Sequence, residues 1–134
     1  MEFRQTQKVL FKHCDPAGIV FYPRYFEIMN DCVEAFFDHI GFAFEDLHKT
    51  HAVPTVRIET SFRSPSRHGD MLTLGLRCKN IGRTSLSIEI TTACEGETRL
   101  VFDATLVHID GSGAPAPWPE ALRQAFLPYQ QNEA

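Results

Sequence analysis

The pattern of apolar and polar residues begins with a short alternating segment. Residues 3–12 are rich in residue types that favour β-structure, and most of their apolar side chains share one parity, which predicts a first strand. The pattern then breaks at Pro16 and Gly18, two residue types that are typical of loops. The chain is therefore expected to open with a strand followed by a loop.

A long amphipathic helix is predicted after this loop. Its apolar residues recur at the spacing of one helical face, at Tyr22, Phe26, Met29, Val33, Phe36, Phe37 and Ile40. The opposite face carries Glu27, Asp31, Glu34 and Asp38. Pro23 suits the first helical turn, and Gly41 stands where a glycine commonly ends a helix. We expect a helix of about five turns that packs against a broad surface such as a curved sheet.

The second half of the chain reads as a set of strands. Apolar and polar residues alternate over 56–63, 72–78 and 86–91, and residues 99–109 are apolar on both parities, as in a central strand. Short turn segments separate these stretches, which predicts that successive strands are antiparallel neighbours. Shorter helices are expected at 44–47 and 120–126, before a frayed C-terminal end.

Length and composition limit the classes of protein that fit. A chain of 134 residues with 43% apolar and 22% charged residues predicts one soluble domain over residues 1–134. The net charge of −4 argues against a general nucleic-acid binder, and no apolar run is long enough to span a bilayer. The N-terminal residues lack the apolar core of a signal peptide, so the cytoplasm is the expected compartment. Four scattered cysteines without a C-x-x-C pair predict neither a metal site nor a disulfide framework.

Asp15 is the first candidate for chemistry, because it lies in the loop just before the long helix. The first N–H groups of a helix have no partner within the helix and favour negative charge that develops on a substrate. By composition alone, a turn or capping role is the favoured interpretation of Asp15, since this is a common role for aspartate before a helix.

The loop as a whole points to a known family. The diagnostic stretch is Asp15-Pro16-Ala17-Gly18-Ile19-Val20-Phe21-Tyr22-Pro23, with Tyr25 shortly after. This stretch closely resembles the active-site loop and helix start of the 4-hydroxybenzoyl-CoA thioesterase family. The resemblance implies an α+β hotdog fold, in which an antiparallel sheet of about five strands wraps around one long central helix. It also implies an acyl-CoA thioesterase.

Site residues follow from the same resemblance. It implies that Asp15 is the catalytic carboxylate, as nucleophile or general base, and that the backbone N–H of Tyr22 polarises the thioester carbonyl. Arg83, Thr84 and Ser85 match the turn that contacts the nucleotide end of coenzyme A in that family, often from another subunit. Relatives that act on short-chain and carrier-bound acyl groups often have histidine in place of Tyr22, so the tyrosine favours an aromatic acyl-CoA.

The resemblance also implies the assembly and the cofactors. A homodimer that assembles to a homotetramer is expected. No metal and no separate cofactor are expected, since coenzyme A arrives as part of the substrate.

Several other residues have two interpretations. His13 could share proton traffic with Asp15 or could be a solvated residue at a strand end. Asp31 and Glu34 could include a catalytic carboxylate on the helix, but their face favours a solvated surface. The remaining two sets are a basic set, which could bind phosphates or line a solvated sheet face, and an aromatic set, which could form core or acyl pocket. The basic set is Arg57, Arg63, Arg67 and His68, and the aromatic set is Phe26, Phe36, Phe37 and Phe62.

Two rival functions are left open. A hotdog hydratase or dehydratase would need a histidine and a carboxylate that work together. A non-catalytic protein that binds acyl-CoA or a phenolic ligand would bind without turnover.

Overall fold

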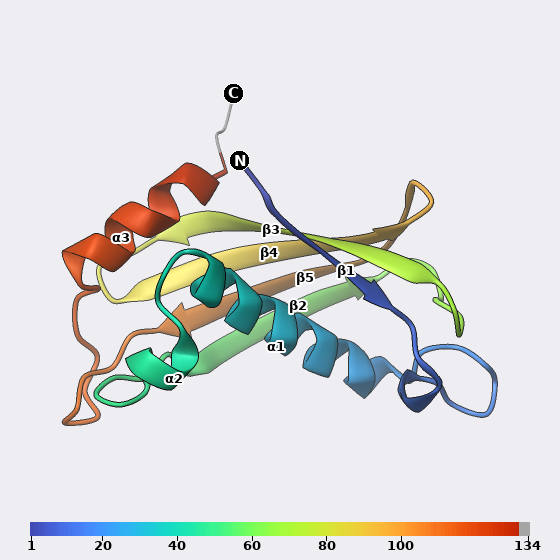
Figure 1. Cartoon of the computed structure of the whole chain (residues 1–134), viewed down its shortest axis with the longest axis horizontal. Helices are drawn as coiled ribbons and strands as arrows, with labels where there is room; N and C mark the ends of the chain where they lie inside the picture. Colours follow the sequence, from blue (N-terminus) through green and yellow to red (C-terminus); the bar gives the residue numbers. More distant parts are fainter. Residues whose placement is uncertain (132–134) are drawn as a thin grey trace.

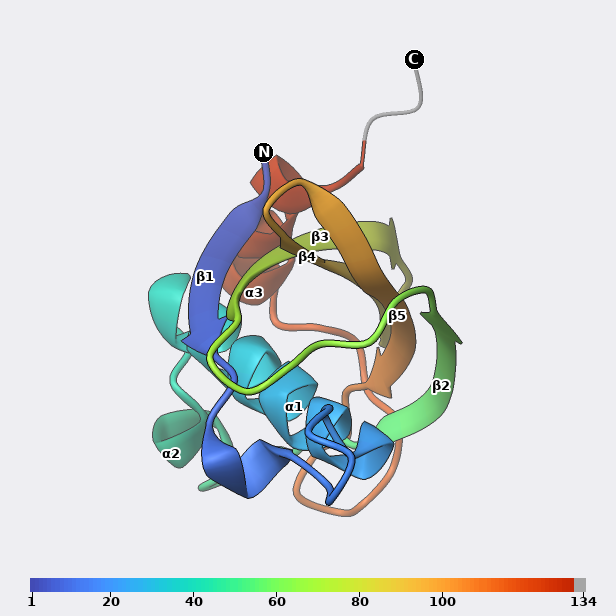
Figure 2. The same ribbon diagram turned by 90° about the vertical axis from the view of Figure 1, so that its right-hand side faces the viewer.

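One long helix lies in the hollow of a curved five-stranded antiparallel sheet (Figures 1 and 2). A computed structural model describes residues 1–131. The strands are β1 (Phe3–Lys8), β2 (Thr55–Phe62), β3 (Met71–Ile81), β4 (Ser85–Cys94) and β5 (Glu97–Val107). The helices are α1 (Tyr22–His39), α2 (Phe44–Leu47) and α3 (Glu120–Phe126), with 3-10 turns at Phe11–His13 and Leu127–Tyr129. The α+β hotdog architecture expected from the sequence is confirmed.

The strand order is β1-β3-β4-β5-β2, which corrects one prediction. A short link between β2 and β3 was expected to make them neighbours, but β2 pairs with β5 and β3 pairs with β1 and β4. Figure 2 shows the link crossing the open end of the curved sheet, in front of the start of α1. Because the sheet curves around the helix, its two sides approach each other, and eight residues suffice to join strands that are not paired.

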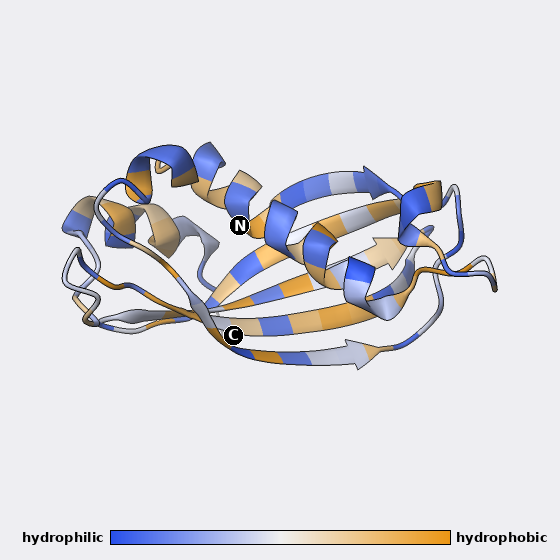
Figure 3. Cartoon of the chain, turned by 90° about the horizontal axis from the view of Figure 1, so that it is seen from below, coloured by the Kyte–Doolittle hydropathy of each residue, from blue (hydrophilic) through white to orange (hydrophobic). Residues whose placement is uncertain are grey.

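The buried face of helix α1 matches the predicted face except near the start of the helix. The buried residues are Tyr25, Ile28, Met29, Cys32, Val33, Phe36 and Phe37. Tyr22 remains 59% exposed and Phe26 is half-buried, whereas Tyr25 is buried, so the first turn packs through Tyr25 in place of Tyr22. Alternating hydrophobic and hydrophilic residues along the strands bury one sheet face against this helix (Figure 3).

The first strand is shorter than predicted. It ends at Lys8, and Val9 is buried beyond it, where its N–H donates to the carbonyl of Asp70 at 2.8 Å. The chain then turns through Phe11–His13, which leaves the Phe11 ring 81% exposed. The 3-10 turn at Leu127–Tyr129 replaces part of the frayed end that was predicted, and residues 132–134 lie outside the described residues.

Strand β2 forms one edge of the sheet and is exposed along most of its length. Val56, Ile58 and Phe62 are large apolar side chains that this edge leaves open to solvent. No helix in the described part of the chain is both long enough and apolar enough to cross a membrane.

Candidate active site

Residues 14–20 fold back on themselves to form a tight loop. The N–H of Asp15 donates to the carbonyl of Ile19 at 2.9 Å, and the N–H of Gly18 donates to the carbonyl of Asp15 at 2.9 Å. Gly18 has a φ of +81°, a left-handed conformation that glycine adopts without strain. This glycine lets the chain reverse, so that Asp15 and the start of α1 belong to two arms of one loop.

The carboxylate of Asp15 has one oxygen occupied and one free. Oδ1 accepts a hydrogen bond from the N–H of Ala17 at 2.9 Å, an Asx turn of the kind that aspartate commonly forms in loops. Within residues 1–131, Oδ2 has no hydrogen-bond partner. Asp15 therefore acts as a turn residue, yet one oxygen stays available for chemistry.

That carboxylate lines an open hollow of about 390 Å³. The other residues of this hollow are Phe11, Cys14, Pro16, Gly18 and His68. Of the sequence-predicted candidates, the structure thus brings His68 to the same hollow as Asp15. We call it the carboxylate hollow.

Tyr22 begins α1, and its side chain faces a different hollow of about 330 Å³. Ile19, Val20, Tyr25, Phe62, Arg63, Ser64 and Pro65 complete this second lining, which we call the tyrosine hollow. In the described chain no carbonyl or side chain accepts a hydrogen bond from the Tyr22 N–H, because the first helical N–H groups have no intrahelical acceptor. This N–H is free to bind an oxyanion, while the role of Tyr22 in catalysis stays a prediction.

His13 is buried, and its interpretation as a solvated strand-end residue is wrong. Only 5% of the residue is exposed, and Nδ1 accepts a hydrogen bond from the N–H of Leu10 at 2.9 Å. Its carbonyl accepts the N–H of Phe21 at 2.9 Å, directly before the start of α1. Burial, followed by the nearby positive charge of Lys12, lowers the pKa of the His13 imidazole. His13 therefore holds the two arms of the loop together in its neutral form.

This burial predicts a pH-dependent loss of stability. The unfolded chain takes up a proton on His13 near pH 6.5, whereas the folded chain does so only at lower pH. As pH falls through 6.5, the unfolded state binds more protons and the free energy of unfolding decreases. His13→Asn keeps an oxygen that can accept the Leu10 N–H but does not titrate. In urea unfolding at pH 7.5 and pH 5, wild type is expected to lose more stability than the variant. Equal losses would contradict the prediction.

The segment between β2 and β3 is fixed against the loop by a residue that sequence reasoning missed. Nη1 of Arg99, on β5, donates to the carbonyl of Pro65 at 3.0 Å and to Oδ2 of Asp70 at 2.8 Å. The N–H of Arg67 and the Arg99 guanidinium lower the pKa of the Asp70 carboxyl. Ser66 then accepts the N–H of Val20 at 2.8 Å, which ties the segment to the loop. Arg99 also pairs with Glu97 at 2.8 Å, but its partners on this segment lie about 30 positions away in the sequence, so no short-range signal marks this role.

The basic set is divided between two places. Arg63, Arg67 and His68 lie on the segment that crosses beside the loop, and Arg63 and His68 line the two hollows. Arg57 lies instead on the outer face of the sheet, where it pairs with Glu59 at 3.1 Å. The phosphate interpretation stays a prediction for the three residues of the crossing segment, whereas Arg57 fits the solvated sheet face.

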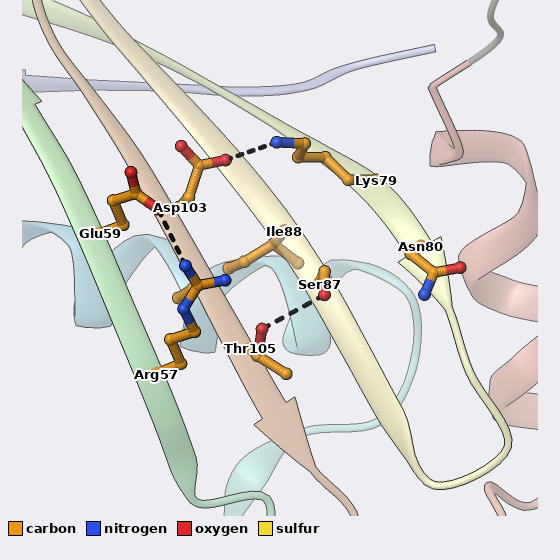
Figure 4. Close-up of a pocket in the computed structure, with 9 residues that line it drawn as sticks. Arg57, Glu59, Lys79, Asn80, Ser87, Ile88, Asp103 and Thr105 are labelled. Atoms are coloured by element: carbon orange, nitrogen blue, oxygen red, sulfur yellow. Dashed lines mark hydrogen bonds and ion pairs between the residues drawn. The ribbon is translucent and has the colours of Figure 1, made fainter.

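The outer face of the sheet holds a further hollow of about 440 Å³, shown in Figure 4. Ion pairs occupy it: Arg57 with Glu59, and Lys79 with Asp103 at 2.9 Å. Ser87 and Thr105 share a hydrogen bond there at 3.2 Å. Arg57 of the basic set lines this hollow, but Asp15, Tyr22 and Arg83 do not, so its residues fit the interpretation of a solvated sheet face.

Arg83 and Thr84 lie in the turn between β3 and β4, and Ser85 begins β4; their main-chain carbonyls are all hydrogen-bonded. The carbonyl of Arg83 accepts the N–H of Trp118 at 3.1 Å, and the carbonyl of Thr84 accepts the N–H of His108 at 2.7 Å. Ser85 accepts the indole N–H of Trp118 through its carbonyl at 3.0 Å. The Arg83 guanidinium is exposed and makes no ion pair with any described residue.

This turn lies at the opposite end of the sheet from the loop that precedes α1 (Figure 1). Strand β3 starts beside the loop, and its 11 residues span about 33 Å before the turn. Arg83 and Asp15 of one chain are therefore not brought together.

The remaining candidate residues differ in how far they are buried. Asp31 and Glu34 are exposed on α1, as the solvated interpretation predicts. Phe36 and Phe37 are fully buried core residues, whereas Phe62 is half exposed. Within the described residues, no group of three or more His, Cys, Asp and Glu side chains is placed to hold a metal ion.

Comparison with known proteins gives a family and a fold. The model of the Thioesterase-like superfamily matches residues 9–126. A 1,4-dihydroxy-2-naphthoyl-CoA thioesterase from Synechocystis is similar in structure, with a TM-score of 0.88, 17% identity, and coverage of 95% of this chain and 96% of that one. A Staphylococcus aureus protein solved in complex with CoA gives a TM-score of 0.91 at 18% identity, covering 100% of this chain and 89% of that chain. A gentisyl-coenzyme A thioesterase gives 0.85 at 25% identity, covering 93% and 99%. No curated protein matches the sequence.

Proposed function

The chain belongs to the thioesterase-like superfamily, and we propose that it is an acyl-CoA thioesterase that hydrolyses an aromatic or medium-length acyl-CoA to free acid and CoA. The observation that carries this proposal is the loop before α1, which presents a free Asp15 carboxylate oxygen and an unpartnered Tyr22 N–H on its two arms. Similar structures include two thioesterases of hydroxylated aromatic acyl-CoAs and a protein bound to CoA, which supports the substrate class.

The proposed chemistry needs only these two groups of the chain. The Asp15 carboxylate either attacks the thioester carbonyl, to give a mixed anhydride, or removes a proton from the attacking water. The oxygen of the carbonyl becomes negative as the bond forms, and the Tyr22 N–H donates to it. One such donor typically lowers the barrier by about 2.7–4 kcal/mol. The Tyr22 side chain has no part in this step.

A complete site is proposed to require a second copy of the chain. Strand β3, about 33 Å long, separates the Arg83 turn from the loop of Asp15, so the Arg83 that binds the nucleotide end of CoA is proposed to come from a neighbouring subunit. The exposed edge of β2, with Val56 and Ile58, offers unpaired main-chain groups for a partner strand. These features support a homodimer, whereas the proposed homotetramer rests on the family resemblance alone.

The function is tested by free-thiol release from a panel of thioesters. The panel contains benzoyl-, hydroxybenzoyl-, phenylacetyl- and straight-chain acyl-CoAs. The CoA released and the mass of the protein are measured in the same reaction. We expect hydrolysis of at least one aromatic or medium-length member. Binding of the panel members without thiol release would favour the binding-protein alternative.

The hydratase alternative is checked in the same preparation. His68 lines the hollow of Asp15, so a histidine and a carboxylate do share one hollow. His13 does not line it, and its Nδ1 accepts a hydrogen bond from the N–H of Leu10. Hydration of an enoyl-CoA, measured as a loss of its ultraviolet absorbance, would support that alternative. We expect thiol release and no hydration.

Replacing Arg83 by alanine is expected to raise KM for acyl-CoA about tenfold with little change in kcat. A charged hydrogen bond to phosphate contributes roughly 1.5–3 kcal/mol, and exposure of Arg83 to solvent reduces this value. The same variant should not change KM for the acyl-pantetheine thioester, which lacks the nucleotide. Arg57→Ala, on the outer sheet face, is the matched control. Equal effects of Arg83→Ala on both substrates would exclude phosphate contact.

A further inference from the structure

We infer that the exposed ring of Phe11 is the surface against which an aromatic acyl group packs, which makes Phe11 a specificity-determining residue. This inference rests on the proposed function, because it places the acyl group next to the Asp15 carboxylate. Nothing in the alternation of the sequence distinguishes Phe11 from the core residues of the first strand.

Phe11 is exposed because the chain leaves the sheet before reaching it. The 3-10 turn at Phe11–His13 points the ring away from the core, and 81% of the residue is accessible. Burying a phenylalanine side chain would stabilise the fold by roughly 1.5–3 kcal/mol, and this free energy is lost when the ring stays in water. One exposed apolar residue is common in itself, so its surroundings decide whether it has a role.

Those surroundings are the carboxylate hollow. Phe11 and Asp15 both line it, and its volume of about 390 Å³ falls within the range of small-molecule sites. A thioester attacked with help from Asp15 must bring its acyl carbon into this hollow. The atoms bonded to that carbon, which begin the acyl group, then lie within reach of the Phe11 ring.

The Phe11 ring packs beside a second ring. Its centroid lies 5.9 Å from that of His68, with the planes inclined at 57°. Aromatic pairs at such distances are favourable, and His68 is anchored on the segment that Arg99 fixes to the sheet. The imidazole of His68 has no hydrogen-bond partner within residues 1–131. The pair therefore forms an exposed aromatic wall with one polar edge, in the hollow of the Asp15 carboxylate.

The tyrosine hollow is the other place where an aromatic ring could lie. It has Tyr22, Tyr25 and Phe62 in its lining but no carboxylate. Its polar side chains are those of Tyr22, Tyr25, Arg63 and Ser64, none of which can act as a carboxylate nucleophile or base. The Tyr25 hydroxyl is buried, and burial raises the pKa of this phenol. The position of Asp15 therefore favours the carboxylate hollow for the acyl ring.

The experiment compares benzoyl-CoA with hexanoyl-CoA, which differ in ring character more than in size. Phe11→Leu should lower the ratio of kcat/KM for benzoyl-CoA to that for hexanoyl-CoA about three- to tenfold, the range that the specific part of an aromatic contact supplies. Phe62→Leu, in the tyrosine hollow, is the matched control and should leave this ratio unchanged. Since Phe11 is exposed, its variant should unfold at the wild-type temperature.

A binding measurement separates this inference from the proposed function. Dissociation constants of both thioesters are measured by calorimetry with Asp15→Asn, alone and combined with Phe11→Leu. A selective loss of benzoyl-CoA affinity in the double variant supports the inference even where wild type hydrolyses neither thioester. The inference is overturned if Phe11→Leu affects both ligands equally or neither, if neither ligand binds, or if Phe62→Leu changes the ratio instead.

Discussion

Asp15→Asn is expected to lower kcat for thioester hydrolysis by about 10²–10⁴-fold, the typical contribution of a positioned general base, and by more if the carboxylate attacks directly. Asparagine keeps the side-chain oxygen that accepts the Ala17 N–H, so the loop should retain its shape. What it loses is the negative charge of the free oxygen. The change should therefore appear in kcat, with KM altered little, when thiol release is followed over a range of substrate concentrations.

The chain provides a matched control for this substitution. Asp110 forms the same kind of turn, with Oδ1 accepting the N–H of Ser112 at 2.9 Å, but it lies outside both hollows. Asp110→Asn is expected to hydrolyse acyl-CoA at the wild-type rate. Full activity of Asp15→Asn would exclude Asp15 from the chemistry. If activity falls, mass spectrometry of rapidly quenched enzyme distinguishes the two mechanisms, because an acyl group on the Asp15 peptide identifies direct attack.

Phe36→Ala is expected to reduce the free energy of unfolding by about 3–5 kcal/mol, the usual range for removing a large core side chain. Phe36 is fully buried in the middle of an aromatic cluster, with ring centroids 5.0 Å from Tyr129 and 5.7 Å from Phe3. These partners come from the two ends of the chain. The substitution should therefore loosen α1 from both β1 and the C-terminal turn.

Urea unfolding measures this effect, with the midpoint falling at a nearly constant slope. The control is Phe11→Ala, which removes the same side chain from an exposed position and should change stability by no more than about 0.5 kcal/mol. A loss of less than about 1 kcal/mol for Phe36→Ala would show that the cluster does not carry the stability assigned to it.

Features set by neighbouring residues could be predicted from the sequence. The helix from Tyr22 to His39 follows from its apolar spacing, with Pro23 in its first turn and Gly41 just after its end. The strands follow from their alternation. Asp15 was found because its loop has a recognisable sequence, and the structure adds that Gly18 takes the left-handed conformation that the loop needs.

Features that depend on the curvature of the sheet could not be predicted. Pairing of β2 with β5 requires the sheet to wrap around α1, and a short link alone argued for pairing with β3. The burial of His13 required a 3-10 turn in place of a longer strand, and a strand pattern gives no sign of where a turn begins. Arg99 acts through groups about 30 positions away, which no local pattern reveals. The division of the proposed site residues between opposite ends of the sheet likewise appeared only in three dimensions.

The length of β3 has a genetic consequence. We consider a site that takes its carboxylate from one copy and its phosphate-binding arginine from another. A chain altered at Asp15 still carries an intact Arg83, and a chain altered at Arg83 still carries an intact Asp15. Mixing two such inactive or weakened proteins, after their subunits exchange, would create some sites with both groups intact. The two lesions would then complement each other, as alleles of one gene do when their products share an active site.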